Sequence, residues 1–403
     1  MLRSLFARLR QFSRDRRQQR RIAILSQCDA AALATQPPPD PRRVLVVRND
    51  SIGDYLLYRP WLRRLSAAAH HRGQHLVLVA NALWAPLAQA WDGDLAAEII
   101  PVQFDRFFKD LAYRAAIVQR IGQLGAGEVI YPLHVREPAA ENFIRFLRAP
   151  VRVASQGGHV HDPWFALLDA GYTRLLPTTR TVLFEYHRNQ EFFEHWQHHA
   201  LAPAAAAALP EAAAPLTLPL AVQEAGAVLA AQPYLVLFPG ASARQKRWPA
   251  QRFGELAKAL HQHYGPRYRL VVAGSPGDNA YVPALVRAAG PAVPIDNQCG
   301  QTDLPGLATL IAGAQLLISN DTVAAHLAAQ ASTPCVVLLM GENYGKFFPY
   351  PPALLHAPCR CLFPPSQEAR FARGDFSPPA HDPAIGQIEP GRVLAAATEL
   401  LGG

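Results

Sequence analysis

Short, mostly apolar runs recur along this chain, and a longer amphipathic segment separates each run from the next. In the first half the runs are VLVVR, HLVLVA, EIIPV, EVIYPL and VRVAS, at residues 44–48, 75–80, 98–102, 128–133 and 151–155. Apolar runs of this length, alternating with helical segments, are typical of buried strands in a parallel sheet built from βαβ units. The pattern therefore predicts an α/β fold.

The pattern begins a second time after a stretch of different composition. Residues 200–220 are rich in alanine and proline and nearly uncharged, which suits a connection between domains better than a packed element. Further apolar runs follow at 234–238, 268–274, 315–319 and 334–340. We therefore expect two Rossmann-like domains in tandem, with a cleft between them.

These signals predict the domain boundaries. Residues 1–41 are expected to form a basic tail and a linker, because the sequence TQPPPDP near their end breaks any helix. The two domains are expected at 42–199 and 233–387. An Ala/Pro-rich interdomain linker is expected at 200–232, and a closing helix at 388–403.

The net charge of +8 is concentrated at the N-terminus. Residues 1–21 contain eight arginines and one aspartate, so this segment carries +7 of the total. Leucine and phenylalanine interleave with the arginines at helical spacing, as in basic amphipathic segments on anionic membrane surfaces. A solvated arginine tail is the alternative interpretation, and a nucleic-acid partner is not expected.

Other features of the sequence narrow the class of protein. No run approaches the roughly 18–20 apolar residues that span a bilayer, and the arginine-rich N-terminus lacks the apolar region of a secretory signal. The five cysteines are odd in number and mostly scattered, which is not typical of a disulfide framework. We expect a cytosolic chain with reduced thiols.

Ligands of open α/β sheets bind where strands end and helices begin, and three such junctions carry unusual residues. At the first junction, residues 48–65, a polar loop follows the strand. Gly53 there permits a tight turn, which places Asp54 at a helix start. The alternative interpretation is an aspartate that only complements the helix dipole.

The second junction, residues 238–253, is a loop with Ser242, Arg244 and Lys246 that leads into a helix. Main-chain N–H groups, a helix N-terminus and cations are what a phosphate needs, and this loop offers all three. The alternative is that its cations are merely solvated.

The third junction, residues 316–330, continues from a strand into a helix. Asn320, Asp321 and Thr322 are predicted to cap that helix, and His326 lies within it. A histidine in such a place is more often structural than functional.

Together the three junctions resemble those of the ADP-heptose:lipopolysaccharide heptosyltransferases, which are GT-B glycosyltransferases of family 9. The matching blocks are R-x-D-x-I-G-D at Arg48–Asp54, G-A-S-x-x-x-K-x-W-P at Gly240–Pro249 and D-T-x-x-x-H-L-A at Asp321–Ala328. The resemblance implies an N-terminal domain that binds the acceptor and a C-terminal domain that binds the nucleotide sugar. It further implies an inverting, metal-independent enzyme that moves a heptose from ADP-heptose to a lipopolysaccharide or related glycan.

The resemblance also implies roles for individual residues. Asp54 would be the general base that deprotonates an acceptor hydroxyl. Lys246, with Arg244 and Ser242 of the same motif, would bind the donor diphosphate and stabilise the leaving group. Asp278, which follows the sequence GSPG, would lie where relatives contact the nucleotide ribose.

In the third block Asp321, Thr322 and His326 would face the donor phosphates. Val323 departs from the family pattern, which has glycine there, so the donor or acceptor preference of this chain is open. Together with the basic amphipathic pattern of residues 1–21, the resemblance leads us to expect a protein bound through that segment to the cytoplasmic face of the inner membrane. No cofactor other than the donor nucleotide sugar is expected.

Several alternatives remain at this stage. The donor could be a UDP- or GDP-sugar, and the chain could be a nucleotide-binding module without catalysis. Asp92 and Asp94 form a D-x-D, the metal-binding element of GT-A transferases, although it precedes a predicted strand. His159 and His161 lie in a loop that would either contact an acidic glycan or form plain surface. The dinucleotide fingerprint G-x-G-x-x-G is absent, which argues against a dehydrogenase.

Overall fold

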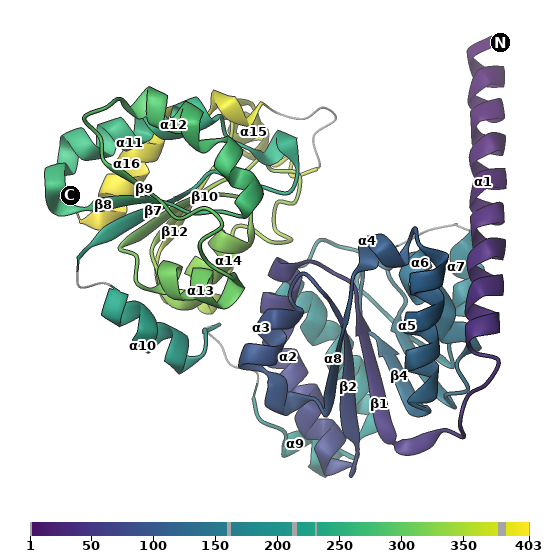
Figure 1. Cartoon of the computed structure of the whole chain (residues 1–403). Coiled ribbons are helices and arrows are strands. Elements are labelled where there is room, and N and C mark those ends of the chain that lie inside the picture. Colours follow the sequence, from purple (N-terminus) through teal and green to yellow (C-terminus); the bar gives the residue numbers. More distant parts are fainter. Residues whose placement is uncertain (1, 159–162, 212–215, 230–231, 378–383, 403) are drawn as a thin grey trace. The chain divides into compact units, whose positions relative to one another are not determined.

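The computed structural model describes residues 2–158, 163–211, 216–229, 232–377 and 384–402. The chain divides into two compact units (Figure 1). Unit 1 consists of Met1–Thr181 and Tyr186–Ala212, and unit 2 consists of Val182–Glu185 and Ala213–Gly403.

Unit 1 contains a six-stranded sheet in the order β3-β2-β1-β4-β5-β6, in which all neighbours are parallel. The strands are β1 (Asp40–Arg48), β2 (His75–Asn81), β3 (Glu98–Val102), β4 (Ala126–Tyr131), β5 (Val151–Ser155) and β6 (Arg174–Leu176). The helices are α1 (Leu2–Ala32), α2 (Ile52–His71), α3 (Ala85–Trp91), α4 (Phe104–Phe107), α5 (Leu111–Gln123), α6 (Pro138–Glu141), α7 (Pro163–Asp169), α8 (Glu185–Ala200) and α9 (Pro203–Ala207).

Unit 2 repeats this architecture. Its six strands are all parallel, in the order β12-β11-β10-β7-β8-β9, which is the strand order of unit 1 listed from the opposite edge. The strands are β7 (Tyr234–Phe238), β8 (Arg269–Val272), β9 (Ile295–Asn297), β10 (Leu316–Asn320), β11 (Cys335–Leu338) and β12 (Cys359–Leu362). The helices are α10 (Leu220–Leu229), α11 (Ala250–Tyr264), α12 (Val282–Ala289), α13 (Leu304–Ala312), α14 (Val323–Ala331), α15 (Pro365–Phe371) and α16 (Pro390–Leu401).

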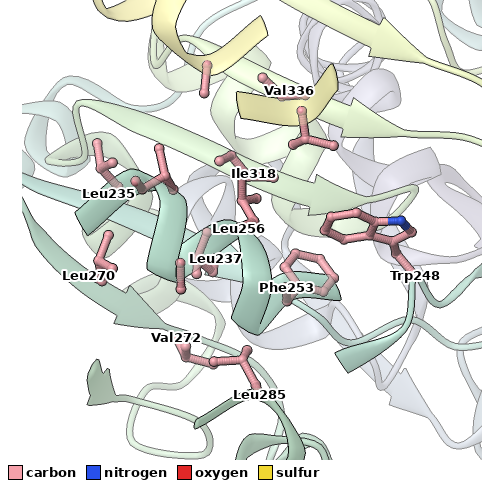
Figure 2. Packing of buried hydrophobic residues seen from close by; sticks show 14 of the residues in the cluster. Leu235, Leu237, Trp248, Phe253, Leu256, Leu270, Val272, Leu285, Ile318 and Val336 are labelled. Carbon is pink, nitrogen blue, oxygen red and sulfur yellow. The ribbon is translucent and has the colours of Figure 1, made fainter. Parts of the chain in front are cut away.

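The central strands of both sheets are covered on both faces, which explains their apolar runs. Every residue of β7 and β10 is buried. In unit 2, α11, α12 and α16 lie on one face of the sheet and α13 and α14 on the other (Figure 1). Phe253 and Leu256 of α11 pack against strand residues such as Leu237 and Ile318 in the core (Figure 2).

The predicted α/β fold with two Rossmann-like sheets is confirmed, and each predicted apolar run contains a strand. The strands β6, β9 and β12 were not predicted. They have three or four residues each, and all three lie at sheet edges. A short edge strand lacks the apolar run of a central strand because it has a neighbour on one side only.

The prediction that residues 1–41 form only a tail and a linker is wrong. Residues 2–32 form α1, and the second half of this helix packs on α5 in unit 1. Its Asp29 is fully buried and accepts two hydrogen bonds of 2.6 Å from the guanidinium of Arg114, and a third from Asn142. The buried ion pair and the apolar contacts of Leu25 therefore attach α1 to the domain.

The prediction of a linker at 200–232 is also wrong for part of that segment. Leu216 and Leu218 are buried, and α10 packs against α13. The contact is close, since a Cβ added to Gly226 would lie 2.8 Å from the Cβ of Ala312. Composition did not indicate this packing because alanine and glycine permit close helix contact without forming a long apolar run.

We expect Asp29→Ala to lower the free energy of unfolding by about 3–5 kcal/mol, because it leaves the charge of Arg114 buried without its partner. Glu98→Ala is the control, since it removes the carboxylate of an exposed pair with Arg120 in the same unit. Such pairs contribute about 0–1 kcal/mol. Urea denaturation of both variants measures the difference, and equal losses would contradict an anchoring role for Asp29.

Candidate functional site

The strand order of each sheet reverses at one place, and that place is where a ligand is expected. Successive strands are added in one direction from β1 to β3 and in the other direction from β4 to β6, so the order reverses between β1 and β4. In unit 2 the same reversal lies between β7 and β10. Open α/β sheets bind ligands beyond the carboxyl ends of the strands at such a reversal. The loops after β1, β7 and β10 carry the three sequence motifs.

In unit 1, Asp54 lies in the first turn of α2 and is partly buried. Its Oδ2 accepts a hydrogen bond of 3.3 Å from the main-chain N–H of Ser51 and one of 2.5 Å from the Ser51 hydroxyl. The expected tight turn at Gly53 is wrong, because that residue has a helical conformation inside α2. The helix nevertheless begins where the sequence predicts, and it continues through Pro60.

Four hydrogen bonds hold the two residues that follow β1. The side-chain amide of Asn81 donates to the main-chain carbonyls of Asn49 (3.1 Å) and Asp50 (3.0 Å), and the Trp84 indole donates to the latter (3.0 Å). The Tyr131 hydroxyl donates to Oδ1 of Asn49 at 2.7 Å. Groups from β2, β4 and the start of α3 therefore hold this loop in place.

Arg48 and Asp50 form an ion pair inside this loop. The Arg48 side chain is fully buried, that of Asp50 is 11% exposed, and Nε donates to Oδ2 at 3.1 Å. Arg48 also donates to Oδ1 of Asn189 at 3.1 Å and lies 3.7 Å from the centre of the Tyr58 ring. The sequence placed Arg48 and Asp50 within a motif but assigned neither of them a role.

The environment of Asp50 changes its acidity. Burial raises the pKa of Asp50 to about 6, the Arg48 guanidinium acts to lower it, and the Asp54 carboxylate adds to the rise. Oδ2 takes the hydrogen bonds from Arg48, whereas Oδ1 is buried and has no hydrogen-bond partner in the described part of the chain.

In unit 2, Asn320 joins the loop after β10 to the loop after β7. Its side-chain amide donates to the main-chain carbonyls of Pro239 (2.8 Å) and Gly240 (3.2 Å), and its Oδ1 accepts from the N–H of Trp248 (3.1 Å). Asn320 is fully buried. It was predicted as a helix cap, but its side chain instead fixes the position of the second motif against the third.

Lys246 and Asp321 meet at this junction. Nζ of Lys246 lies 2.9 Å from Oδ2 of Asp321 and 3.1 Å from Oε1 of Glu342, and the lysine side chain is 19% exposed. Burial acts to lower the pKa of Lys246, but the two carboxylates outweigh it, so the pKa is raised above its usual value. Lys246 therefore stays cationic. Glu342 was not predicted, since it lies outside all three motifs.

The other residues of the third motif have different environments. Thr322 is the N-cap of α14, and its hydroxyl accepts from the N–H of Ala324 at 3.2 Å. His326 is buried, and its Nδ1 shares a hydrogen bond of 2.8 Å with the Tyr350 hydroxyl. The contacts of His326 with Tyr350 and the ring of Phe348 are those expected of a structural histidine.

Asp278 is buried against the start of the second motif. Its Oδ2 accepts hydrogen bonds from the N–H (2.8 Å) and the hydroxyl (2.7 Å) of Ser275. A Cβ at Gly240 would lie 2.5 Å from the Asp278 carboxylate, so the first position of that motif requires glycine. Ser242 and Arg244, in contrast, are exposed.

A pocket opens beside Asp321 in unit 2. Its wall combines the carboxylates of Asp321 and Glu342 with the rings of Tyr344, Phe347 and Phe363. Carboxylates accept hydrogen bonds from hydroxyl groups, and aromatic faces pack against apolar ligand surfaces. The cavity itself is only about 10 Å³, which is room for about one water molecule.

The remaining candidates from the sequence lie elsewhere. Asp92 of the D-x-D is fully buried in unit 1, where it pairs with Arg59 at 2.7 Å and accepts a hydrogen bond from Tyr55. His159 and His161 lie outside the described residues. Within the described ranges, no group of three His, Cys, Asp or Glu side chains is placed to hold a metal ion.

Comparison with known proteins agrees with the motifs. Residues 167–356 match the model of glycosyltransferase family 9 (heptosyltransferase), a range that includes the second and third motifs. Lipopolysaccharide heptosyltransferase 2 of Escherichia coli K12 is 30% identical over 174 residues, which are 42% of this chain and 47% of the relative. The alignment thus covers about half the length of that curated relative.

Solved structures are similar to this chain over a larger share of its length. A family 9 glycosyl transferase from Veillonella parvula has a TM-score of 0.63 at 19% identity, covering 91% of this chain and 99% of that one. Escherichia coli heptosyltransferase WaaC with ADP has a TM-score of 0.60 at 20% identity, covering 89% and 99%. These likenesses confirm the GT-B fold. The predicted resemblance to the heptosyltransferases is confirmed as well, because residues 167–356 match the model of glycosyltransferase family 9.

Proposed function

We propose that this chain is a glycosyltransferase that moves a heptose from ADP-heptose to a lipopolysaccharide or related glycan acceptor. The observation that carries the proposal is the half-buried Lys246 held beside Asp321 at the strand-order reversal of unit 2. A cation that stays charged there, next to the N-terminus of α14, supplies what a diphosphate needs. Two curated relatives that are 30% identical over 174 residues are lipopolysaccharide heptosyltransferases.

In the proposed reaction Asp54 is the general base. Its carboxylate takes the proton of an acceptor hydroxyl while that oxygen attacks the anomeric carbon of the donor. The bond between the anomeric carbon and the diphosphate oxygen breaks, ADP leaves with the electron pair, and the new bond forms with inversion. The hydrogen bonds from Ser51 to Oδ2 hold the carboxylate in one orientation, and they leave Oδ1 for the proton.

Charge on the departing diphosphate is proposed to be stabilised without a metal. Lys246 offers its ammonium group, and α14 offers main-chain N–H groups at its N-terminus. Glu342 and Asp321 both contact the ammonium group. A bound diphosphate would replace one of these carboxylates as the partner of Lys246. Asp278, Thr322, His326, Ser242 and Arg244 remain proposed donor-binding residues.

Residues 1–21 are proposed to bind an anionic membrane surface on the cytoplasmic side of the inner membrane. Residues 2–21 belong to α1, whose arginines Arg16, Arg17, Arg20 and Arg21 are exposed. Within the described part of the chain, no helix is both long and apolar enough to cross a bilayer. Contact with the membrane would therefore depend on charge and on the apolar residues between the arginines.

We expect Asp54→Asn to reduce kcat by about 10²–10⁴-fold, because the change removes a base and barely alters shape. Nucleotide affinity should stay nearly the same, because asparagine keeps the shape of the aspartate side chain. Asp105→Asn, in the first turn of α4, is the control and should keep full activity. A loss of less than about tenfold in a folded Asp54→Asn variant would reject the base.

We expect Lys246→Ala to lower kcat and the kcat/KM for the donor by about 10²-fold, because it removes a cation that stabilises the leaving group. The KM for the acceptor should hardly change. Lys258→Ala, at an exposed lysine of α11, is the matched control.

Val323→Gly should maintain or tighten ADP binding, measured by calorimetry. Unchanged ADP affinity and turnover in Lys246→Ala and Val323→Gly would contradict the proposed diphosphate site.

We expect deletion of residues 2–21 to release the protein from anionic vesicles without lowering turnover on a soluble acceptor analogue. Each basic residue near such a surface contributes about 1 kcal/mol. Replacing the eight arginines with lysine should retain binding, whereas replacing them with glutamine should abolish it. Co-sedimentation over a range of salt measures both variants. Binding that is insensitive to salt or to lipid charge would argue against the membrane role.

A further inference from the structure

The loop between β1 and α2 holds a second carboxylate for which the proposed reaction has no role. Asp50 lies four positions before Asp54, on a loop that four hydrogen bonds from neighbouring elements keep in place. Its Oδ2 binds Arg48, a fully buried side chain, while its Oδ1 is buried without a partner in the described residues.

The groups around Asp50 come from each element that packs on the loop. Within the described residues, Arg48 at the end of β1 is the cation that faces it, Asp54 and Tyr58 of α2 are the titratable groups nearby, and Tyr131 of β4 bonds to the adjacent Asn49. Asn189 of α8 bonds to the far side of the Arg48 guanidinium. Asn81 and Trp84, which contact the main-chain carbonyl of Asp50, carry no charge.

The charge state of Asp50 therefore determines how Arg48 is held. When the carboxylate is ionised, the Arg48–Asp50 pair is a charge-assisted contact of a buried guanidinium. When the carboxyl group is protonated, Arg48 keeps its charge but loses its anionic partner. Such a change at the base of the loop would shift the turn that carries Ser51 and Asp54.

We propose that Asp50 is a positioning residue for the transfer reaction, and that its ionised form holds Arg48 and the loop in the arrangement that presents Asp54 to the acceptor. This inference rests on the proposed function. It adds a residue to the acceptor side of the site that no comparison assigns. It also implies that the enzyme becomes fully active only as Asp50 loses its proton, in the range where burial and Asp54 raise its pKa to about 6.

The test compares wild-type and Asp50→Asn activity across pH. Asparagine imitates the neutral carboxyl group at every pH, so the ratio of wild-type to variant kcat should be below about twofold at pH 5 and reach about tenfold at pH 8. Asp54 is present in both proteins, so its own titration appears in both profiles. A residue with only a structural role would give a ratio that does not change with pH.

Asp40→Asn is the matched control. Asp40 pairs with Arg42 two positions along the chain, as Asp50 does with Arg48, but at the opposite end of β1. The ratio of wild-type to Asp40→Asn kcat should stay near one from pH 5 to pH 8. Asp50→Glu keeps an ionisable group and should recover part of the activity at pH 8. A constant ratio for Asp50→Asn in an active enzyme would overturn this inference and leave the proposed function intact, whereas absence of transfer by the wild type would overturn both.

A second measurement does not depend on transfer activity. The pKa of Asp50 is about 6 in the folded protein, against about 3.9 in an unfolded chain. The stability that this shift contributes is therefore present below about pH 4 and lost as the pH rises through 6. Relative to Asp50→Asn, the folded-to-unfolded ratio of the wild type should fall about 50-fold between pH 4 and pH 7.

If Asp50→Asn does not fold, Asp54→Asn replaces it in the stability measurement. Removing the Asp54 charge lowers the pKa of Asp50, so the fall in the folded-to-unfolded ratio between pH 4 and pH 7 should become smaller than in the wild type. An unchanged fall in Asp54→Asn would overturn the inference, because Asp50 would then not be coupled to the proposed base.

Discussion

The parallel pairing of β7 with β10 is the constraint on which the candidate donor site depends. The two strands are neighbours in the sheet although about eighty positions separate them in the chain, and their carboxyl ends meet at one edge. The loop after β7 brings Lys246, and the loop after β10 brings Asp321. Asn320 then joins the two loops through three hydrogen bonds. Without this pairing the motif that contains Lys246 and the motif that contains Asp321 would have no common location.

Unit 1 depends on a different kind of interaction, the buried arginine paired with a carboxylate. Arg114 with Asp29, Arg59 with Asp92 and Arg48 with Asp50 all lie in buried or nearly buried positions. Leaving one partner alone in such a pair is costly, so each pair fixes the relative position of two elements. The first attaches α1 to the domain and the second connects α2 to the end of α3. The third pair lies at the loop that precedes Asp54, and there the Arg48 guanidinium also acts to lower the pKa of Asp50.

Features that depend on a short stretch of sequence could be predicted, whereas features that depend on contacts between distant residues could not. The central strands and the positions of the three motifs could be predicted, because a run such as YLVLF at 234–238 reports burial on both faces of a sheet. The packing of α1 and α10 could not, because an arginine-rich helix and an alanine-rich segment have the composition of exposed or linking chain. In α1 the decisive group is one buried aspartate, Asp29, whose partner lies 85 positions away.

The sequence by itself determined the fold class, the strand-to-helix junctions and the family resemblance, since these depend on apolar runs and on motifs of a few consecutive residues. Only the tertiary structure decided that Lys246 lies between Asp321 and Glu342, that Asn320 bridges two loops instead of capping a helix, and that Asp50 is buried against Arg48. Contacts of this kind join residues from different strands and loops. For Lys246 and Asn320 these contacts exist only after the strand order has brought two loops to the same edge of a sheet, and the burial of Asp50 depends on the neighbouring elements that pack on its loop.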